Sequence, residues 1–348
     1  MTSFGNSLVE GVGSPEIVLE SGMNGTLDGS EILELTLINI TMDAWGVTFL
    51  ILSVLTLLTC VCGMVGNGVV VWLLGFRVQR NPFSVYVLNL AVADFLFLLC
   101  LVLVLSMEFL KKMIETYFFF FLLLIIVMFF AYTAGLSLLT VISVQRCLSV
   151  LFPIWYKVHR PRHLSTVVCT LLWGLALLMM TLAISFCYTD IQRGFTMDMF
   201  MNVLILGIFT PIMILSSVVL FVQIQRRPRA WRRRSVRLFV IILVSVLVFV
   251  VCSLPFGIFW TLLYRLQARS YVYYLLMKLS CFTSSLSSSA NPFIYFLVGR
   301  RRSSSLRVPL RSILSRALQE GPELGGKEMS STSGYQDKSS AGRLEDLS

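Results

Sequence analysis

The sequence predicts an all-α membrane protein, a bundle of seven transmembrane helices followed by a short amphipathic eighth helix. Composition is the first reason: 57% of the 348 residues are hydrophobic and 13% are charged, whereas soluble domains are about 45–50% apolar and about 25% charged. The second reason is that the apolar residues fall in blocks long enough to cross about 30 Å of hydrocarbon. The blocks also lack period-two alternation, which favours helices over the strands of a membrane barrel.

Seven such blocks follow one another along the chain, and each is expected to form one spanning helix. They cover about residues 46–74, 83–110, 117–150, 164–188, 199–225, 236–263 and 271–298. Pro211 and Pro255 lie inside the fifth and sixth blocks and predict kinks there, because neighbouring helices can satisfy the carbonyl groups that a proline frees. We therefore expect one seven-helix domain over residues 46–298.

The segment before the first span, residues 1–45, is acidic, with seven Asp and Glu residues and no Lys or Arg. No basic region precedes an apolar core in it, so we expect the first span, not a cleavable signal peptide, to target the chain. The sequons that begin at Asn24 and Asn39 predict an extracellular, N-glycosylated segment.

The basic residues predict the orientation of the bundle. With the N-terminus outside, the inner loops and the segment after the seventh span hold 19 Lys and Arg residues, and the outer loops and helix ends hold six. This bias predicts a multi-pass protein with its N-terminus outside and its C-terminus in the cytoplasm. We expect it in the plasma membrane. The net charge of +10 then faces anionic inner-leaflet lipid, which explains it better than a nucleic-acid partner does.

The chain after the seventh span divides into two parts. Residues 299–318 predict a short amphipathic helix on the membrane surface, because apolar residues alternate with arginines at Leu306, Leu310, Ile313, Leu314 and Leu318. Residues 319–348 are polar and rich in Gly and Ser, which predicts a disordered cytoplasmic tail.

Motifs for chemistry are lacking in the sequence. The eight cysteines show no metal-ligand spacing, and the two histidines, His159 and His163, lie in the second inner loop. A Gly-rich phosphate loop is also missing. We therefore expect no metal, no cofactor and no enzymatic activity.

A few polar residues lie inside the apolar blocks, where they are costly and indicate function. Asp94 is deep in the second block, and Asn67 and Asn291 lie at comparable depths in the first and seventh. These three side chains could form a buried hydrogen-bonded network that binds water or a small cation. Arg146 stands at the inner end of the third block and Lys278 in the outer part of the seventh.

Many of these residues stand in a pattern that resembles the rhodopsin-like G-protein-coupled receptors. The pattern comprises Asn67 in a Gly-Asn pair, Asp94 in "LAVAD", Arg146, Trp173, Pro211, Pro255 and the box "NPFIY" from Asn291 to Tyr295. Four longer stretches resemble the Mas-related receptor family: "FRVQRNPFSVYVLNLAVADF", "ISVQRCLSVLFPIWYKVHRPRHLSTVVCTLLW", "CSLPFGI" and "SSANPFIYFLVG". The resemblance covers about residues 46–318.

The resemblance implies a receptor that couples ligand binding in the outer bundle to a cytoplasmic heterotrimeric G protein. Its extracellular ligand would be a peptide or small amine, and its tail a site for arrestin. The resemblance assigns the cytoplasmic activation switch to Gln145, Arg146, Pro153 and Tyr295. It assigns the hinge of the sixth helix to Ser253 and Pro255.

The chain departs from the broad class at several of these positions. The class usually has an acid at position 145, and a carboxylate would hold Arg146 by a charge-assisted bond, whereas the amide of Gln145 is a weaker neutral acceptor. We therefore expect a less firmly held resting state and raised ligand-free signalling.

Two further departures concern the middle of the bundle. Ser253 replaces the usual tryptophan of the sixth helix. Gly135 replaces a serine that often helps to hold sodium, so no strong sodium site is expected.

The ligand pocket is predicted from residues in the outer half of the bundle. The candidates are Met128, Tyr132, Asp190, Phe256, Trp260, Tyr264 and Lys278. Phe256, Trp260 and Tyr264 recur every four residues and would share one helix face. The alternatives are that the aromatic residues pack or face lipid, and that Lys278 pairs with Glu108 or Glu115 or extends to the membrane interface.

Two other functions remain open on the sequence. One is a receptor-like protein that acts without ligand, either constitutively or through heteromers. The other is a polytopic transporter, although the chain shows none of the repeated halves that transporters tend to carry.

Overall fold

In the computed structural model, every regular element of the described chain is helical. The structure describes residues 29–77, 81–109, 117–159, 161, 163–189, 191–226, 240–259, 271–300 and 310–318. The predicted tail and four predicted site residues lie outside the described residues; these four are Asn24, Asp190, Trp260 and Tyr264.

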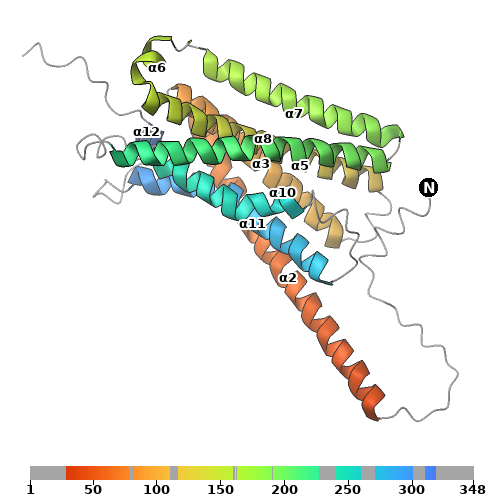
Figure 1. The fold of residues 1–348 in the computed structure, drawn as a ribbon. Helices are drawn as coiled ribbons and strands as arrows, with labels where there is room; N and C mark the ends of the chain where they lie inside the picture. Colours follow the sequence, from red (N-terminus) through yellow and green to blue (C-terminus); the bar gives the residue numbers. More distant parts are fainter. Residues whose placement is uncertain are drawn as a thin grey trace, which may run out of the picture.

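The first helix is much longer than its apolar block. Helix α2 covers Gly29–Trp72, 44 residues, and continues into the π-helical turn η1, Leu73–Arg77. At about 1.5 Å per residue it is about 66 Å long, roughly twice the hydrocarbon thickness. Its first part therefore projects from the bundle, as the red helix in Figure 1 does. The segment 1–45 was predicted only as extracellular chain, but neither Pro nor Gly interrupts residues 30–45, so the helix continues through them.

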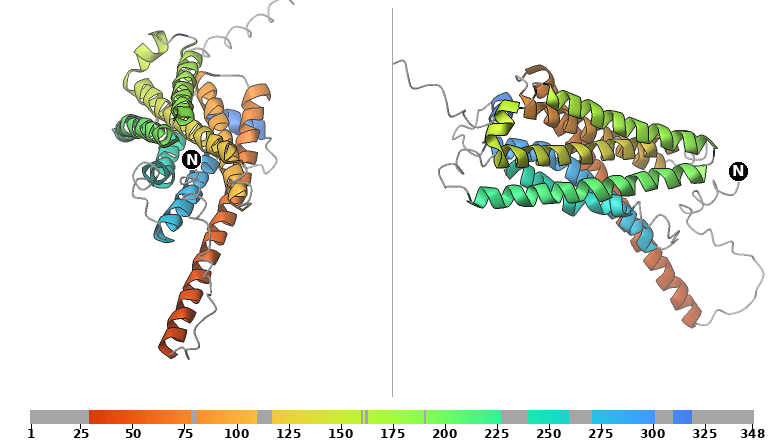
Figure 2. Two further views of the ribbon diagram at one scale, coloured as in Figure 1. Left: turned by 90° about the vertical axis from the view of Figure 1, so that its right-hand side faces the viewer. Right: turned by 45° about the horizontal axis from the view of Figure 1, so that its top comes forward.

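The other spanning helices fall close to the predicted blocks, except that α8 begins at Ile191, before its block at 199; α6 lies in the predicted second inner loop, and α12 covers the second part of the predicted amphipathic helix. Their bounds are α3 Pro82–Phe109, α5 Phe118–Leu151, α6 Pro153–His159, α7 Leu164–Thr189, α8 Ile191–Arg226, α11 Tyr271–Arg300 and α12 Leu310–Leu318. The sixth span, Val240–Ile258, contains the π-helical turn η2, Phe249–Ser253, followed by α10, Leu254–Ile258. Figure 2 shows these helices as one bundle, seen nearly end-on in its left panel.

Among the described residues, six helices are long and apolar enough to cross a membrane, and α11 is not among them. The reason is chemical, because α11 carries six serines between Ser280 and Ser289. Ser284 and Ser285 have no exposed surface, so these hydroxyls face protein and not lipid. The seventh predicted span is therefore a 30-residue helix whose polarity serves packing inside the bundle.

Close contact between α2 and α11 depends on small residues. A Cβ atom added at Gly63 would lie 2.1 Å from Ser289 Oγ. The same hydroxyl donates to the carbonyl of Thr59 at 2.9 Å, and the hydroxyls of Thr59 and Ser285 lie 2.7 Å apart. Small residues and interhelical hydrogen bonds are the usual means by which membrane helices associate.

Helix α5 is the most buried of the six apolar spans and α7 the least. The central position of α5 brings its side chains against α3, α7, α8 and the sixth span. Trp173 of α7 packs against Phe130 of α5, with ring centroids 5.4 Å apart, and donates through Nε1 to Asn89 Oδ1 of α3 at 2.9 Å. A shift of α5 would therefore change contacts with several helices at once.

The amphipathic helix α12 packs against the inner end of the bundle. Ile313, Leu314 and Leu318 are buried, whereas Leu310 is exposed. The side chain of Asn81 fixes its end, because Nδ2 donates to the Leu318 carbonyl at 3.0 Å. Asn81 Oδ1 also accepts the Ser84 amide at 2.7 Å and so caps the start of α3.

Candidate functional site

The C-terminal part of α5 carries two residues of the predicted switch. Gln145 Nε2 donates to Tyr86 Oη of α3 at 2.5 Å, and its Oε1 accepts from Tyr156 Oη of α6 at 3.2 Å. An amide can do both, because it has donors and an acceptor. Gln145 therefore joins α3, α5 and α6.

Arg146 lies in the protein interior, with 7% of its surface exposed. Its guanidinium carbon is 4.1 Å from the centroid of the Phe83 ring, well within the range of a cation–π contact. Phe83 is itself buried and sits in the first turn of α3. The sequence prediction did not include Phe83 or Tyr86, although their spacing of three places them on one face of a helix.

Pro153 stands at the start of α6, directly after the end of α5. Helix α5 ends at Leu151, Phe152 takes a non-helical conformation, and α6 begins at Pro153. The exposed fractions of Phe152, Ile154 and Val158 are 56%, 80% and 70%. This short helix thus presents an apolar surface at the inner end of the bundle.

The predicted polar network lies in the middle of the bundle. Asn291 Nδ2 donates to Asp94 Oδ2 at 2.8 Å, which joins α11 to α3. Asn67 Nδ2 donates to the Gly63 carbonyl at 3.0 Å and to the Ser288 carbonyl at 3.1 Å, which joins α2 to α11. The three residues are buried and are connected through one segment of α11. Tyr295, one turn beyond Asn291, is buried as well.

The bend of the sixth span contains both predicted hinge residues. Ser253 is the last residue of η2, and Pro255 lies in the first turn of α10. π-Helical turns mark functional sites in many helices, and a proline removes one hydrogen bond of the ladder.

Tyr132 of α5 reaches this bend. Its hydroxyl donates to the Ser253 carbonyl at 3.1 Å and is also in hydrogen-bonding contact with the backbone of Gly257. A Cβ atom at position 257 would lie 2.9 Å from this hydroxyl, so a glycine permits the approach. The hydroxyl thus lies between two backbone groups that are four residues apart.

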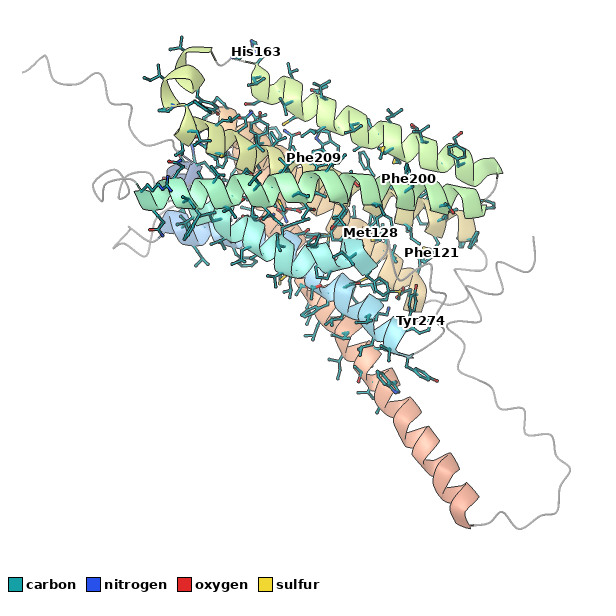
Figure 3. The ribbon with its side chains drawn as sticks, in the orientation of Figure 1. Phe121, Met128, His163, Phe200, Phe209 and Tyr274 are labelled. Atoms are coloured by element: carbon teal, nitrogen blue, oxygen red, sulfur yellow. The ribbon has the colours of Figure 1, made fainter. Side chains whose placement is uncertain are left out.

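Three predicted pocket residues lie in the core of the described structure. Met128 (Figure 3), Tyr132 and Phe256 have 2%, 8% and 0% of their surface exposed. The Phe256 ring packs against those of Phe97, Phe129 and Tyr132, at centroid distances of 5.7, 5.8 and 5.3 Å. This arrangement corresponds to the packing alternative, and direct contact of these residues with a ligand stays a prediction.

An ion pair joins Lys278 of α11 to Glu108 of α3. The side chains are 15% and 23% exposed. Pairing with Glu108 was one of the alternatives open on the sequence. Nearby, Trp45 of α2 stacks on Tyr271 of α11 with centroids 5.9 Å apart. Asn39 lies within α2, where only the backbone is described.

This bundle, with an arginine at the inner end of its third span and an Asp–Asn pair in its middle, has the features of a seven-helix receptor. Residues 66–295 match the family model of the 7 transmembrane receptor (rhodopsin family), and the chain belongs to that family. Membership explains the motif set from Asn67 to Tyr295, and it defines a receptor and not an enzyme.

Comparison with individual proteins narrows the class. The chain is 51% identical to the human Mas-related G-protein coupled receptor member D over 313 residues, 88% of this chain and 97% of the relative. It is 52% identical to the mouse member D over 318 residues, 89% of this chain and 98% of the relative. It is 44% identical to the rhesus macaque (Macaca mulatta) member X3 over 282 residues, 78% and 84% of the two chains. Within the rhodopsin family the chain is therefore a Mas-related G-protein-coupled receptor, a multi-pass membrane protein, as the sequence motifs predicted.

Proposed function

We propose that this receptor transmits an extracellular signal through α5 to the bend of the sixth span and from there to a G protein. The observation that carries the proposal is the hydrogen bond from Tyr132 to the Ser253 carbonyl. It ties the helix that carries Gln145 and Arg146 to the segment that contains Pro255. A ligand that shifts the outer part of α5 then changes the strain on this bend.

The bend is suited to a two-state motion. A π-helical turn followed by a proline weakens the backbone hydrogen-bond ladder locally. The part of the sixth span that precedes η2 can therefore swing with little loss of hydrogen bonding. Hinge motion of this kind moves a whole helix end when only a few residues change conformation. In this proposal the outward swing uncovers Arg146, which is buried in the described state.

The inner end of the bundle faces the cytoplasm in this proposal, and the N-terminus lies outside the plasma membrane, in agreement with the bias of basic residues. Phe152 and helix α6, with Ile154 and Val158, then present apolar side chains to water, where such exposure indicates a protein partner. We assign this surface to the Gα subunit.

The ligand is a peptide or a small amine that binds at the outer end of the bundle. Asp190, Trp260 and Tyr264 are the proposed contacts, together with the partly exposed pair of Lys278 and Glu108. A cationic ligand would compete with Lys278 for the Glu108 carboxylate. The observation that favours the ligand-independent alternative is Gln145, which offers Arg146 no carboxylate.

One experiment tests both functions. The receptor is expressed in cells without endogenous receptors of this class, and activation of each Gα family is read with and without a panel of basic peptides and small amines. Arg146→Ala is the matched control, because it removes the switch and leaves the outer end intact. Ligand-dependent activation that Arg146→Ala abolishes supports the receptor; activation that no ligand changes supports the alternative. Silence of the wild-type protein at normal surface expression contradicts both.

A further inference from the structure

We propose that Phe83 is a positioning residue for G-protein activation: its ring holds the Arg146 guanidinium against α3 in the resting receptor. The inference rests on the proposed role of Arg146 and adds a partner on a different helix. The guanidinium must leave the ring before it can reach a G protein.

The geometry supports a cation–π contact. The guanidinium carbon lies 4.1 Å from the ring centroid, and the exposed fractions of Arg146 and Phe83 are 7% and 4%. The face of an aromatic ring carries negative quadrupole charge, and its attraction for a cation grows when water is excluded from the pair. Both groups meet that condition.

The backbone that carries the ring is held by the cap at the start of α3. Asn81 caps the helix through the Ser84 amide, and Pro82 follows at the first helical position, where its missing N–H costs nothing. One turn later Tyr86 accepts the hydrogen bond of Gln145. Two consecutive residues of α5 therefore each contact an aromatic side chain on one face of α3.

The same geometry limits the strength of the contact. The guanidinium lies beside the first turn of α3, which contains no acid, and a helix N-terminus carries partial positive charge. The quadrupole of the ring attracts the cation against this field, whereas a carboxylate would attract it much more strongly. A contact of moderate strength suits two side chains that must separate reversibly.

The test varies the quadrupole and not the size of the ring. Phe83 is replaced by 4-fluoro-, 3,5-difluoro- and 3,4,5-trifluorophenylalanine through nonsense suppression, and by Phe83→Leu and Phe83→Tyr. Ligand-free activation of each Gα family is read at matched surface expression. Fluorine withdraws charge from the face of the ring in steps, so we expect a stepwise increase that reaches about tenfold in the trifluoro variant and in Phe83→Leu. Phe83→Tyr is expected to stay at the wild-type level.

Two controls separate this inference from the proposed function. Fluorination of Phe95, a partly exposed ring on the same helix, checks the effect of incorporation and is expected to change nothing. Arg146→Ala in each background is expected to abolish activation. If Arg146→Ala has no effect, the proposed switch is refuted. If Arg146→Ala abolishes activation but the fluorinated series is flat or falls, the role of Phe83 is refuted. An increase in Phe83→Leu without a trend in the series also refutes it, because packing alone would then explain the effect.

Discussion

Removal of one hydroxyl group tests the link between α5 and the sixth span. Tyr132→Phe deletes the donor to the Ser253 carbonyl, 3.1 Å away, and leaves the aromatic ring among its neighbours. Those neighbours are Phe97, Phe249 and Phe256, at centroid distances of 6.1, 6.2 and 5.3 Å. The substitution thus removes the hydrogen bond to Ser253 and the contact with the Gly257 backbone, both in the sixth span, and no apolar contact.

The size of the effect follows from the energy of that bond. Interhelical hydrogen bonds in membrane proteins contribute about 0.6 kcal/mol on average and about 1.7 kcal/mol at most. If the bond exists only in the resting state, its loss raises the ratio of active to resting receptor by about threefold to about eighteenfold. In the proposed mechanism the described state, in which Arg146 is buried, is the resting one.

The assay is ligand-free Gα activation at matched surface expression. Thr140→Val is the control, because Thr140 lies on the same helix and its hydroxyl approaches the Phe209 carbonyl of α8 at 3.4 Å, not the sixth span. Tyr132→Phe is expected to raise the signal, and Thr140→Val to leave it unchanged. An unchanged or lower signal in Tyr132→Phe, or an equal increase in both variants, would refute the link.

Three further substitutions have clear expected results. Gln145→Glu places a carboxylate beside Arg146 and should lower ligand-free Gα activation at matched expression; no decrease contradicts the weak hold at position 145. Gly63→Ala forces a Cβ atom to within 2.1 Å of Ser289 Oγ and should cost about 1–3 kcal/mol, seen as a lower melting temperature in detergent. Gly174→Ala, where nothing lies within 4 Å, should not change it, and equal losses in the two variants would exclude the packing explanation. Asn81→Asp keeps the acceptor for α3 but removes the donor to α12, so amide hydrogen exchange should rise in α12 and not in α3; unchanged exchange in α12 argues against that cap.

Hydropathy and motifs predicted the helices and the middle of the site. The spans follow from long apolar blocks, because a backbone in lipid must satisfy its own hydrogen bonds. The Asp94–Asn291 bond could be predicted because both residues are polar at a similar depth, where an unpaired group is costly. α11 was predicted as a span despite its serines, because it contains the "NPFIY" box and is long enough to cross a membrane.

The contacts at the C-terminal end of α5 and at the bend of the sixth span could not be predicted in the same way. Hydropathy measures whether a residue prefers water or hydrocarbon, but it does not indicate which other residue its side chain contacts. Phe83 lies 63 positions from Arg146 in the sequence, and an aromatic residue at the start of a span is equally compatible with a lipid contact. Tyr132 was predicted as a pocket residue, whereas the structure bonds its hydroxyl to the backbone of the sixth span. Whether an aromatic residue lines a pocket or packs in a core depends on the relative placement of helices, which periodicity does not determine.

The two contacts of α5 should act on one equilibrium. Tyr132 and Arg146 are 14 positions apart, about 21 Å along a helix, so their local energies should be independent. If each contact stabilises the same resting state, the increases in the ratio of active to resting receptor multiply. With about threefold from Tyr132→Phe and about tenfold from Phe83→Leu, the double variant should reach about thirtyfold. An increase no larger than that of the stronger single variant would mean that the two contacts do not hold the same state. Multiplication instead identifies α5 as the helix whose position sets the equilibrium, because it is the element that both contacts share.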